Sequence, residues 1–143
     1  MTRGRAPNGF TLIELMVVLV IVAGLLLVAL PGYRDAMQKG RRSDARATLQ
    51  EVAARQEKFM SGRSTYTTSV VNLGYENPLV SPEAHYQIAV DAPTGDCPID
   101  TCYSLTATPR ADSPQSDDKN CTSFTLASNG AKTATGERDD ECW

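Results

Sequence analysis

An uninterrupted apolar run near the N-terminus limits what this chain can fold into. Residues 10–30 contain only two polar side chains, Thr11 and Glu14. As a helix these 21 residues rise about 31 Å, which matches the roughly 30 Å hydrocarbon thickness of a bilayer. Arg3 and Arg5 precede the run, so the positive-inside rule keeps the N-terminus in the cytoplasm. The sequence therefore predicts a single-pass membrane helix with the rest of the chain on the other side.

The charge separates by region once that run is set aside. Residues 34–63 carry eight basic and four acidic side chains, whereas residues 64–143 carry four basic and twelve acidic ones. A basic stem thus precedes an acidic head, and opposite charges can steer copies of one chain onto each other. The alternative is that both regions are simply solvated. The length of 143 residues excludes a large multidomain enzyme, and the pI of about 5.1 disfavours a strongly basic nucleic-acid binder.

All four cysteines follow the apolar run, which suggests disulfides in an oxidising compartment. They are Cys97, Cys102, Cys121 and Cys142. Four cysteines allow three pairings, and zinc binding is the rival interpretation. Zinc is disfavoured because only Cys97 and Cys102 have knuckle-like spacing and the single histidine, His85, lies far from the others in sequence.

Glu14 is the residue that an ordinary membrane anchor leaves unexplained. A carboxylate inside a membrane helix costs roughly 2.5–3.5 kcal/mol on insertion scales, so it suggests a functional role. A secretory signal peptide does not explain it either, because Pro31 stands where the cleavage site after the run would need a small residue.

The residues around Glu14 resemble the processing site of type IV pilins and the related pseudopilins. The similarity consists of the hexapeptide Gly-Phe-Thr-Leu-Ile-Glu at residues 9–14, the apolar run that follows it, and then Pro31 and Tyr33. The resemblance implies that a prepilin peptidase cuts between Gly9 and Phe10 and methylates the new amine of Phe10.

The resemblance also implies a role for Glu14 in assembly. Its carboxylate would pair with the Phe10 amine of a neighbouring subunit, which offsets the cost of desolvating both charges and sets the axial register. A pair within one subunit is the alternative, because a spacing of four residues permits it.

The pattern and the resemblance together divide the chain into four parts. These are a cleaved leader at residues 1–9, a hydrophobic transmembrane or filament-core helix at 10–33, an amphipathic helix at 34–62, and a globular head at 63–143. Pro31 and Gly32 are predicted to break or bend the helix, because proline removes a hydrogen bond and clashes with the preceding turn. Apolar residues at spacings of three and four predict that the second helix packs a stripe on the head.

The predicted fold class is α+β, as in the type IV pilin fold, with the long helix packed on a four-stranded antiparallel sheet. The strands are expected at residues 85–90, 103–108, 123–127 and 131–135, after a connector at 61–83. In this order Cys97–Cys102 would close the loop between the first two strands. Cys121–Cys142 would tie the third strand to the C-terminal tail and resembles the C-terminal disulfide-bounded region of type IV pilins. The Cys97–Cys102 pair is less general in that family.

The resemblance implies a structural subunit of a type IV pilus, most similar to PilE-type minor pilins, with no enzymatic activity, cofactor or metal. It would serve pilus biogenesis, twitching motility or adhesion. Its partners would be other pilin subunits, the prepilin peptidase, the inner-membrane assembly platform and, before assembly, membrane lipid. It would reside in the inner membrane and then in the extracellular pilus.

Three alternative functions remain within this family. They are a major pilin, a pseudopilin of type II secretion, and a minor pilin that acts as a receptor for DNA uptake. The C-terminal cysteines argue against the pseudopilin, whose head typically lacks that disulfide. DNA contact would fall to Lys119, Lys132 and Arg138, which face twelve acidic residues in the same region, whereas phosphate binding needs clustered positive charge.

Two kinds of chemical site were considered and disfavoured. A catalytic triad would have to use His85, and no nucleotide-binding or metalloprotease motif accompanies it. The acidic pairs at 117–118 and 139–140, with Asp112 and Glu141, could gather around calcium, but they lack the spacing of a calcium loop.

Overall fold

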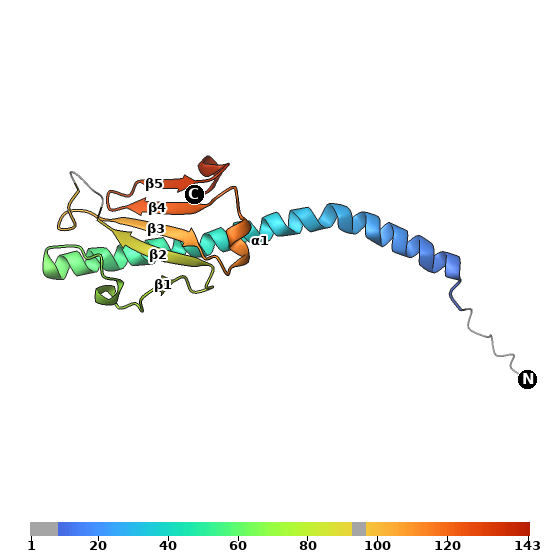
Figure 1. Ribbon diagram of the computed structural model, residues 1–143, viewed down its shortest axis with the longest axis horizontal. Helices are drawn as coiled ribbons and strands as arrows, with labels where there is room; N and C mark the ends of the chain where they lie inside the picture. The colour runs from blue at the N-terminus through green and yellow to red at the C-terminus, as the bar shows by residue number, and fades with distance from the viewer. Residues whose placement is uncertain (1–8, 93–96) are drawn as a thin grey trace, which may run out of the picture. The chain divides into compact units, whose positions relative to one another are not determined.

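The computed structural model describes residues 9–92 and 97–143. They fall into two compact units that meet between Met37 and Gln38. A single helix, α1 (Leu12–Arg63), contributes to both units (Figure 1). The second half of α1 is therefore part of the head.

The N-terminal unit exposes apolar side chains all around its helix. The most apolar window of α1 has a mean hydropathy of 3.0, and none of it is buried. Leu27 and Val28 are 78% and 80% exposed. A helix that is apolar on every face is stable only in apolar surroundings. By length and composition, α1 can cross a membrane.

α1 continues through Pro31 and Gly32, so the helix is not broken there, and the predicted bend stays a prediction. Proline removes its own backbone donor and crowds the preceding turn. In a helix of 52 residues the hydrogen-bonded turns on either side still hold the backbone in place.

In the head, α1 packs one face on the sheet. Ala45, Leu49 and Val52 are fully buried at spacings of four and three residues, as the amphipathic pattern predicts. The next turn buries a polar residue, Gln56. Its Nε2 donates to the carbonyl of Thr67 at 2.6 Å and its Oε1 accepts from the Thr67 amide at 3.2 Å. This pair of hydrogen bonds anchors the connector that follows the helix.

The sheet is antiparallel and has five strands rather than the predicted four, in the order β1-β2-β3-β4-β5 (Figure 1). The strands are β1 (Leu79–Val80), β2 (Tyr86–Asp91), β3 (Ser104–Pro109), β4 (Ser123–Ala127) and β5 (Lys132–Thr135). The sequence analysis did not predict β1, which lies inside the predicted connector. It pairs with β2, where Leu79 is opposite Ile88. Two residues are too few to show the alternating pattern that identifies a strand. The α+β fold class is confirmed.

Strand alternation supplies the sheet's half of the core. Tyr86, Ile88 and Val90 of β2 point to the buried face, and Leu105 and Phe124 do so from β3 and β4. The Tyr86 and Phe124 rings meet edge to face with centroids 5.8 Å apart. Aromatic contacts of this kind stabilise a core beyond the area they bury.

A buried ion pair joins α1 to the segment before β4. Arg42 donates from Nε and Nη2 to the Asp118 carboxylate at 2.7 and 2.8 Å. The side chains of the two residues are 7% and 0% exposed. The carboxylate also accepts from Gln115 Nε2 at 2.7 Å and from the amides of Asn120 and Cys121 at 3.2 and 3.3 Å. A buried charge is tolerated when it is paired and hydrogen-bonded in this way.

We expect Asp118→Ala to lower the free energy of unfolding of the head by about 3–5 kcal/mol, because it removes the buried carboxylate that accepts two hydrogen bonds from the Arg42 guanidinium. Asp112→Ala is the matched control. It removes an aspartate that pairs with Arg110 at the surface, where the two side chains are 69% and 32% exposed, and it should cost about 0–1 kcal/mol. Thermal and denaturant melts of the full chain in detergent measure both. Equal losses in the two variants would contradict the role of the buried pair.

Candidate functional site

The first turn of α1 positions Glu14. Thr11 precedes the helix, and its Oγ1 accepts a hydrogen bond from the Glu14 amide at 3.3 Å. Thr11-x-x-Glu14 is the capping-box pattern, a signal that the sequence analysis did not use. The reciprocal bond from the glutamate side chain is not formed, and within the described residues no hydrogen bond or ion pair engages the Glu14 carboxylate. Residues 9–92 and 97–143 thus leave this carboxylate available to a partner.

The two residues of the predicted processing site lie just before α1. Gly9 and Phe10 are outside the helix, and Phe10 is 84% exposed. Residues 1–8 of the predicted leader lie outside the described residues. The Phe10 amine that cleavage would create lies one helical turn from Glu14 in sequence.

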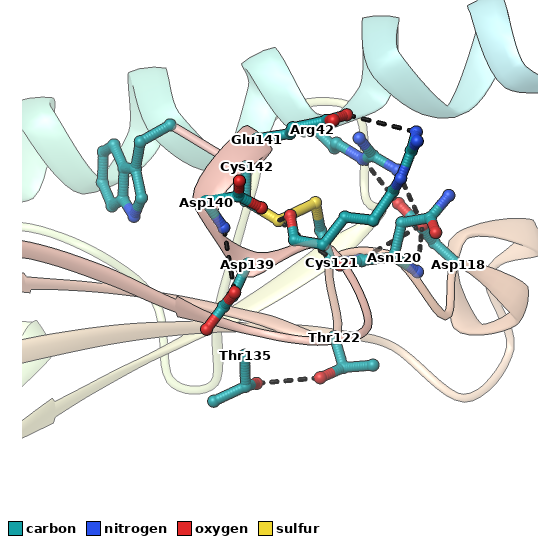
Figure 2. Close-up of a disulfide and its surroundings, with 12 residues drawn as sticks. Arg42, Asp118, Asn120, Cys121, Thr122, Thr135, Asp139, Asp140, Glu141 and Cys142 are labelled. Carbon is teal, nitrogen blue, oxygen red and sulfur yellow. Dashed lines mark hydrogen bonds and ion pairs between the residues drawn. A yellow bond between two sulfur atoms is a disulfide. The ribbon is translucent and has the colours of Figure 1, made fainter.

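The C-terminal region is closed by the Cys121–Cys142 disulfide, as the resemblance implied (Figure 2). Both cysteines are fully buried, and the bond encloses β4, β5 and the short helix η3 (Asp139–Glu141). The return from β5 passes against the carbonyl of Asn120 at Gly136, whose φ is 143°. Only glycine can adopt that conformation there, since a Cβ would collide with the Asn120 backbone.

The last residue anchors the tail to the sheet. Trp143 Nε1 donates to the carbonyl of Thr133 at 2.7 Å, and its ring packs edge to face on Phe124 with centroids 6.0 Å apart. Lys132 Nζ lies 5.2 Å from the centre of the same ring. The disulfide and the tryptophan together hold η3 in a defined position.

Two of the three candidate DNA contacts lie on neighbouring backbone segments. The amides of Glu137 and Arg138 donate to the carbonyls of Lys119 and Asn120 at 3.0 and 3.2 Å, whereas Lys132 begins β5. Arg138 forms an ion pair with Glu141 at 3.2 Å, and Lys132 lies over Trp143. Two of the three cations are therefore already engaged by other side chains of the head.

The second disulfide joins Cys97 to Cys102 between β2 and β3. Residues 93–96 of the same loop lie outside the described residues. The acidic residues considered for calcium do not gather: Asp118 is paired with Arg42, and the described residues contain no group of three or more His, Cys, Asp or Glu side chains arranged to hold a metal ion.

His85 takes part in a local hydrogen bond at the start of the short helix η2 (Pro114–Asp117). Its Nδ1 lies 2.9 Å from Ser113 Oγ. That hydroxyl also accepts from the Gln115 amide, and so it caps η2. Ser113 is 7% exposed, and this arrangement serves the local fold.

Three tyrosine hydroxyls donate hydrogen bonds to glutamates on the side of α1 that faces the connector. Tyr66 and Tyr103 donate to Glu57 at 3.1 and 3.3 Å, and Tyr75 donates to Glu51 at 3.0 Å. Burial and the neighbouring Glu51 raise the pKa of Tyr75 to about 12. Burial and Glu57 raise the pKa of Tyr103 in the same way. These hydroxyls therefore stay protonated at neutral pH and keep both glutamates engaged.

Comparison with known proteins gives matches over nearly the whole chain. Residues 31–125 match a family described as type IV minor pilin ComP, DNA uptake sequence receptor. Residues 4–30 match the prokaryotic N-terminal methylation motif.

Individual proteins agree with these matches. The chain is 30% identical over 100 residues to the type IV major pilin protein PilA of Myxococcus xanthus, over 68% of this chain and 43% of that protein. It is 48% identical over 41 residues to a fimbrial protein of Moraxella nonliquefaciens, over 29% and 27% of the two chains. The alignments thus span less than half the length of these relatives. A type IV pilin from Shewanella oneidensis superposes with a TM-score of 0.50 at 26% identity, over 74% of this chain and 97% of that one.

We expect loss of the Cys121–Cys142 disulfide to cost more than loss of the other one. In the chain-entropy model a loop of 21 residues gives about 3 kcal/mol and a loop of 5 residues about 2 kcal/mol. The double variant Cys121→Ser/Cys142→Ser should therefore melt lower than the control Cys97→Ser/Cys102→Ser, and neither leaves an unpaired thiol. Thermal melts and protein abundance in the membrane test this. The reverse order would show that the C-terminal disulfide does not hold the head together.

Proposed function

We propose that this chain, which belongs to the type IV pilin family, is a structural subunit of a type IV pilus and functions without enzymatic activity. The observation that carries this proposal is the fully exposed apolar half of α1 with an unengaged carboxylate in its first turn. Such a surface needs apolar surroundings and a cationic partner. A bundle of identical processed helices supplies both.

The proposed assembly begins in the inner membrane. The apolar half of α1 is held in lipid, with the head on the side opposite the basic N-terminus. A prepilin peptidase removes residues 1–9 and methylates the Phe10 amine. The assembly platform then transfers the subunit into the extracellular filament, where the helices of other pilin subunits replace lipid.

Charge pairing sets the register in this proposal. Removal of the leader discards Arg3 and Arg5 and leaves one amine at Phe10. Inside a helix bundle both this amine and the Glu14 carboxylate are desolvated, so each is costly unless paired. The amide of Glu14 is already bonded to Thr11, which holds the backbone while the carboxylate reaches the amine of a neighbouring subunit.

We place the chain with minor pilins because the matched minor-pilin family covers residues 31–125. A major pilin is the remaining alternative, since the Myxococcus xanthus relative is a major pilin. The share of this chain in sheared filaments separates the two.

DNA binding is a second candidate function, favoured by the description of the matched family as a receptor for the DNA uptake sequence. The charge arrangement offers limited support, because Arg138 is neutralised by Glu141 and acidic residues surround it. Lys119 and Lys132 are left as exposed cations that could contact phosphate.

DNA binding predicts that the full chain in detergent retards duplex DNA in a gel. Affinity should fall by about tenfold or more between roughly 50 and 200 mM salt, because phosphate contacts release counterions. Lys119→Gln/Lys132→Gln should weaken binding. The control is Arg110→Gln, because Arg110 is already paired with Asp112. No retardation at low salt would remove this candidate function.

We expect Glu14→Ala to give a processed, membrane-inserted protein that fails to enter filaments, since its helix has no carboxylate for the neighbouring amine. Glu76→Ala makes the same chemical change at an exposed position of the head and should assemble normally. Intact mass of the membrane fraction checks the loss of residues 1–9 and the added methyl group. Immunoblots of sheared filaments measure incorporation.

Two outcomes would contradict this account. Normal incorporation of Glu14→Ala would remove the register role of the carboxylate. Absence of the wild-type chain from filaments, or an intact leader in the mature protein, would overturn the proposed function itself.

A further inference from the structure

A cavity with basic walls lies at the C-terminal end of α1. Its volume is about 720 Å³, and it lies between the last two turns of the helix and the segment around the short helix η1 (Val70–Leu73). Three cations line it, Arg55, Lys58 and Arg63, together with Phe59 and Asn72. The described residues that form its wall include no carboxylate. We call it the basic cavity.

Two of the three cations are available to a ligand. Arg55 is engaged within the head, because it donates to Glu51 at 2.8 Å and to the carbonyl of Leu73 at 3.0 Å. Lys58 is exposed, and within the described ranges its side-chain ammonium has no hydrogen bond or ion pair. Arg63 is also exposed and lies 5.5 Å from the centre of the Phe59 ring. The basic cavity therefore presents an uncompensated positive charge.

The opposite charge is concentrated in η3. Asp139, Asp140 and Glu141 are consecutive and exposed, and we call them the acidic turn (Figure 2). Glu141 pairs with Arg138, whereas Asp139 accepts a hydrogen bond from the Asp140 amide. Neither aspartate has a cationic partner within residues 9–92 and 97–143. Because Cys142 is fixed by its disulfide, the acidic turn is preorganised for binding.

The two features lie at different ends of the head. The acidic turn lies beside the early part of the head's helix, where Glu141 and Arg46 line a common cavity. Lys58 is 12 residues further along α1, a rise of about 18 Å. The acidic turn of one copy therefore cannot reach its own basic cavity. Two unlike patches on one chain form a heterologous contact, which repeats head to tail and generates an open helical filament if the rotation does not close.

We propose that the basic cavity receives the acidic turn of a second copy of this chain. Asp139 and Asp140 of one copy face Lys58 and Arg63 of the next, and Glu141 keeps its internal partner. The inference rests on the proposed function in its major-pilin form, because only a subunit that repeats along the filament brings successive copies of this head into contact. The inference gives a reason for the charge pattern of the chain, which is basic at 34–63 and acidic at 64–143: the two regions attract each other between copies.

The test uses the full chain as the sole copy in a host that assembles it. Lys58→Glu alone and Asp140→Lys alone should each lower the amount in sheared filaments by at least about fivefold, because each places like charges opposite one another. Combining the two substitutions restores opposite charges and should return the yield to within about twofold of wild type. Gln50→Glu, which adds a negative charge at an exposed position of α1 away from both the basic cavity and the cavity beside the acidic turn, should leave the yield unchanged.

A second measurement identifies the occupant. A photoreactive amino acid at position 58 should crosslink to a peptide that contains residues 139–141 of another copy. Capture of a different protein, or failure of the double variant to restore the yield while each variant melts like wild type, would overturn the inference. Unchanged yields in both single variants would also overturn it and leave the proposed function standing. Absence of the wild-type chain from filaments would instead remove the proposed function.

Discussion

The ion pair between Arg42 and Asp118 fixes the C-terminal region of this protein to its helix. Asp118 also accepts a hydrogen bond from the Cys121 amide. The same carboxylate is therefore hydrogen-bonded both to α1 and to the first cysteine of the C-terminal disulfide. This one group therefore adds a polar link between α1 and the start of β4 to their shared hydrophobic core. The disulfide then extends this link to Cys142 and the acidic turn.

The two halves of α1 meet opposite physical requirements within one continuous helix. The first half exposes apolar side chains and needs lipid or other helices around it. The second half buries Ala45, Leu49 and Val52 against the sheet and spreads charged side chains over its remaining surface. Because α1 continues through Pro31, one helix carries both the apolar half and the half that packs on the head. A pilin subunit needs both halves as it leaves the membrane.

Local patterns were sufficient to predict most of the fold. Alternation predicted β2, β3 and β4, and β5 was expected as the strand that returns after the Asn-Gly turn at 129–130. The apolar run predicted the exposed apolar half of α1. The two-residue β1 was missed because its pattern is too short, and its pairing with Ile88 is a tertiary contact. The Arg42–Asp118 pair was missed because its partners are 76 residues apart and each looked like an ordinary surface charge. Pro31 does not interrupt α1, because the hydrogen-bonded turns on either side of it hold a long helix together.

The internal contacts of the head determine which charges remain outside. Arg42 and Arg55 use their guanidinium groups to bind Asp118 and the connector, as suits a planar side chain with several donors. Glu51 and Glu57 accept hydrogen bonds from Tyr66, Tyr75 and Tyr103. Glu51 also pairs with Arg55, and within the described residues neither glutamate forms an ion pair with Lys58. Lys58 and Arg63 are thus left positive at one end of the head, while Asp139 and Asp140 stay negative near the other. The folded head therefore carries separate positive and negative patches. The negative patch of a neighbouring copy can pair with the positive patch of this one.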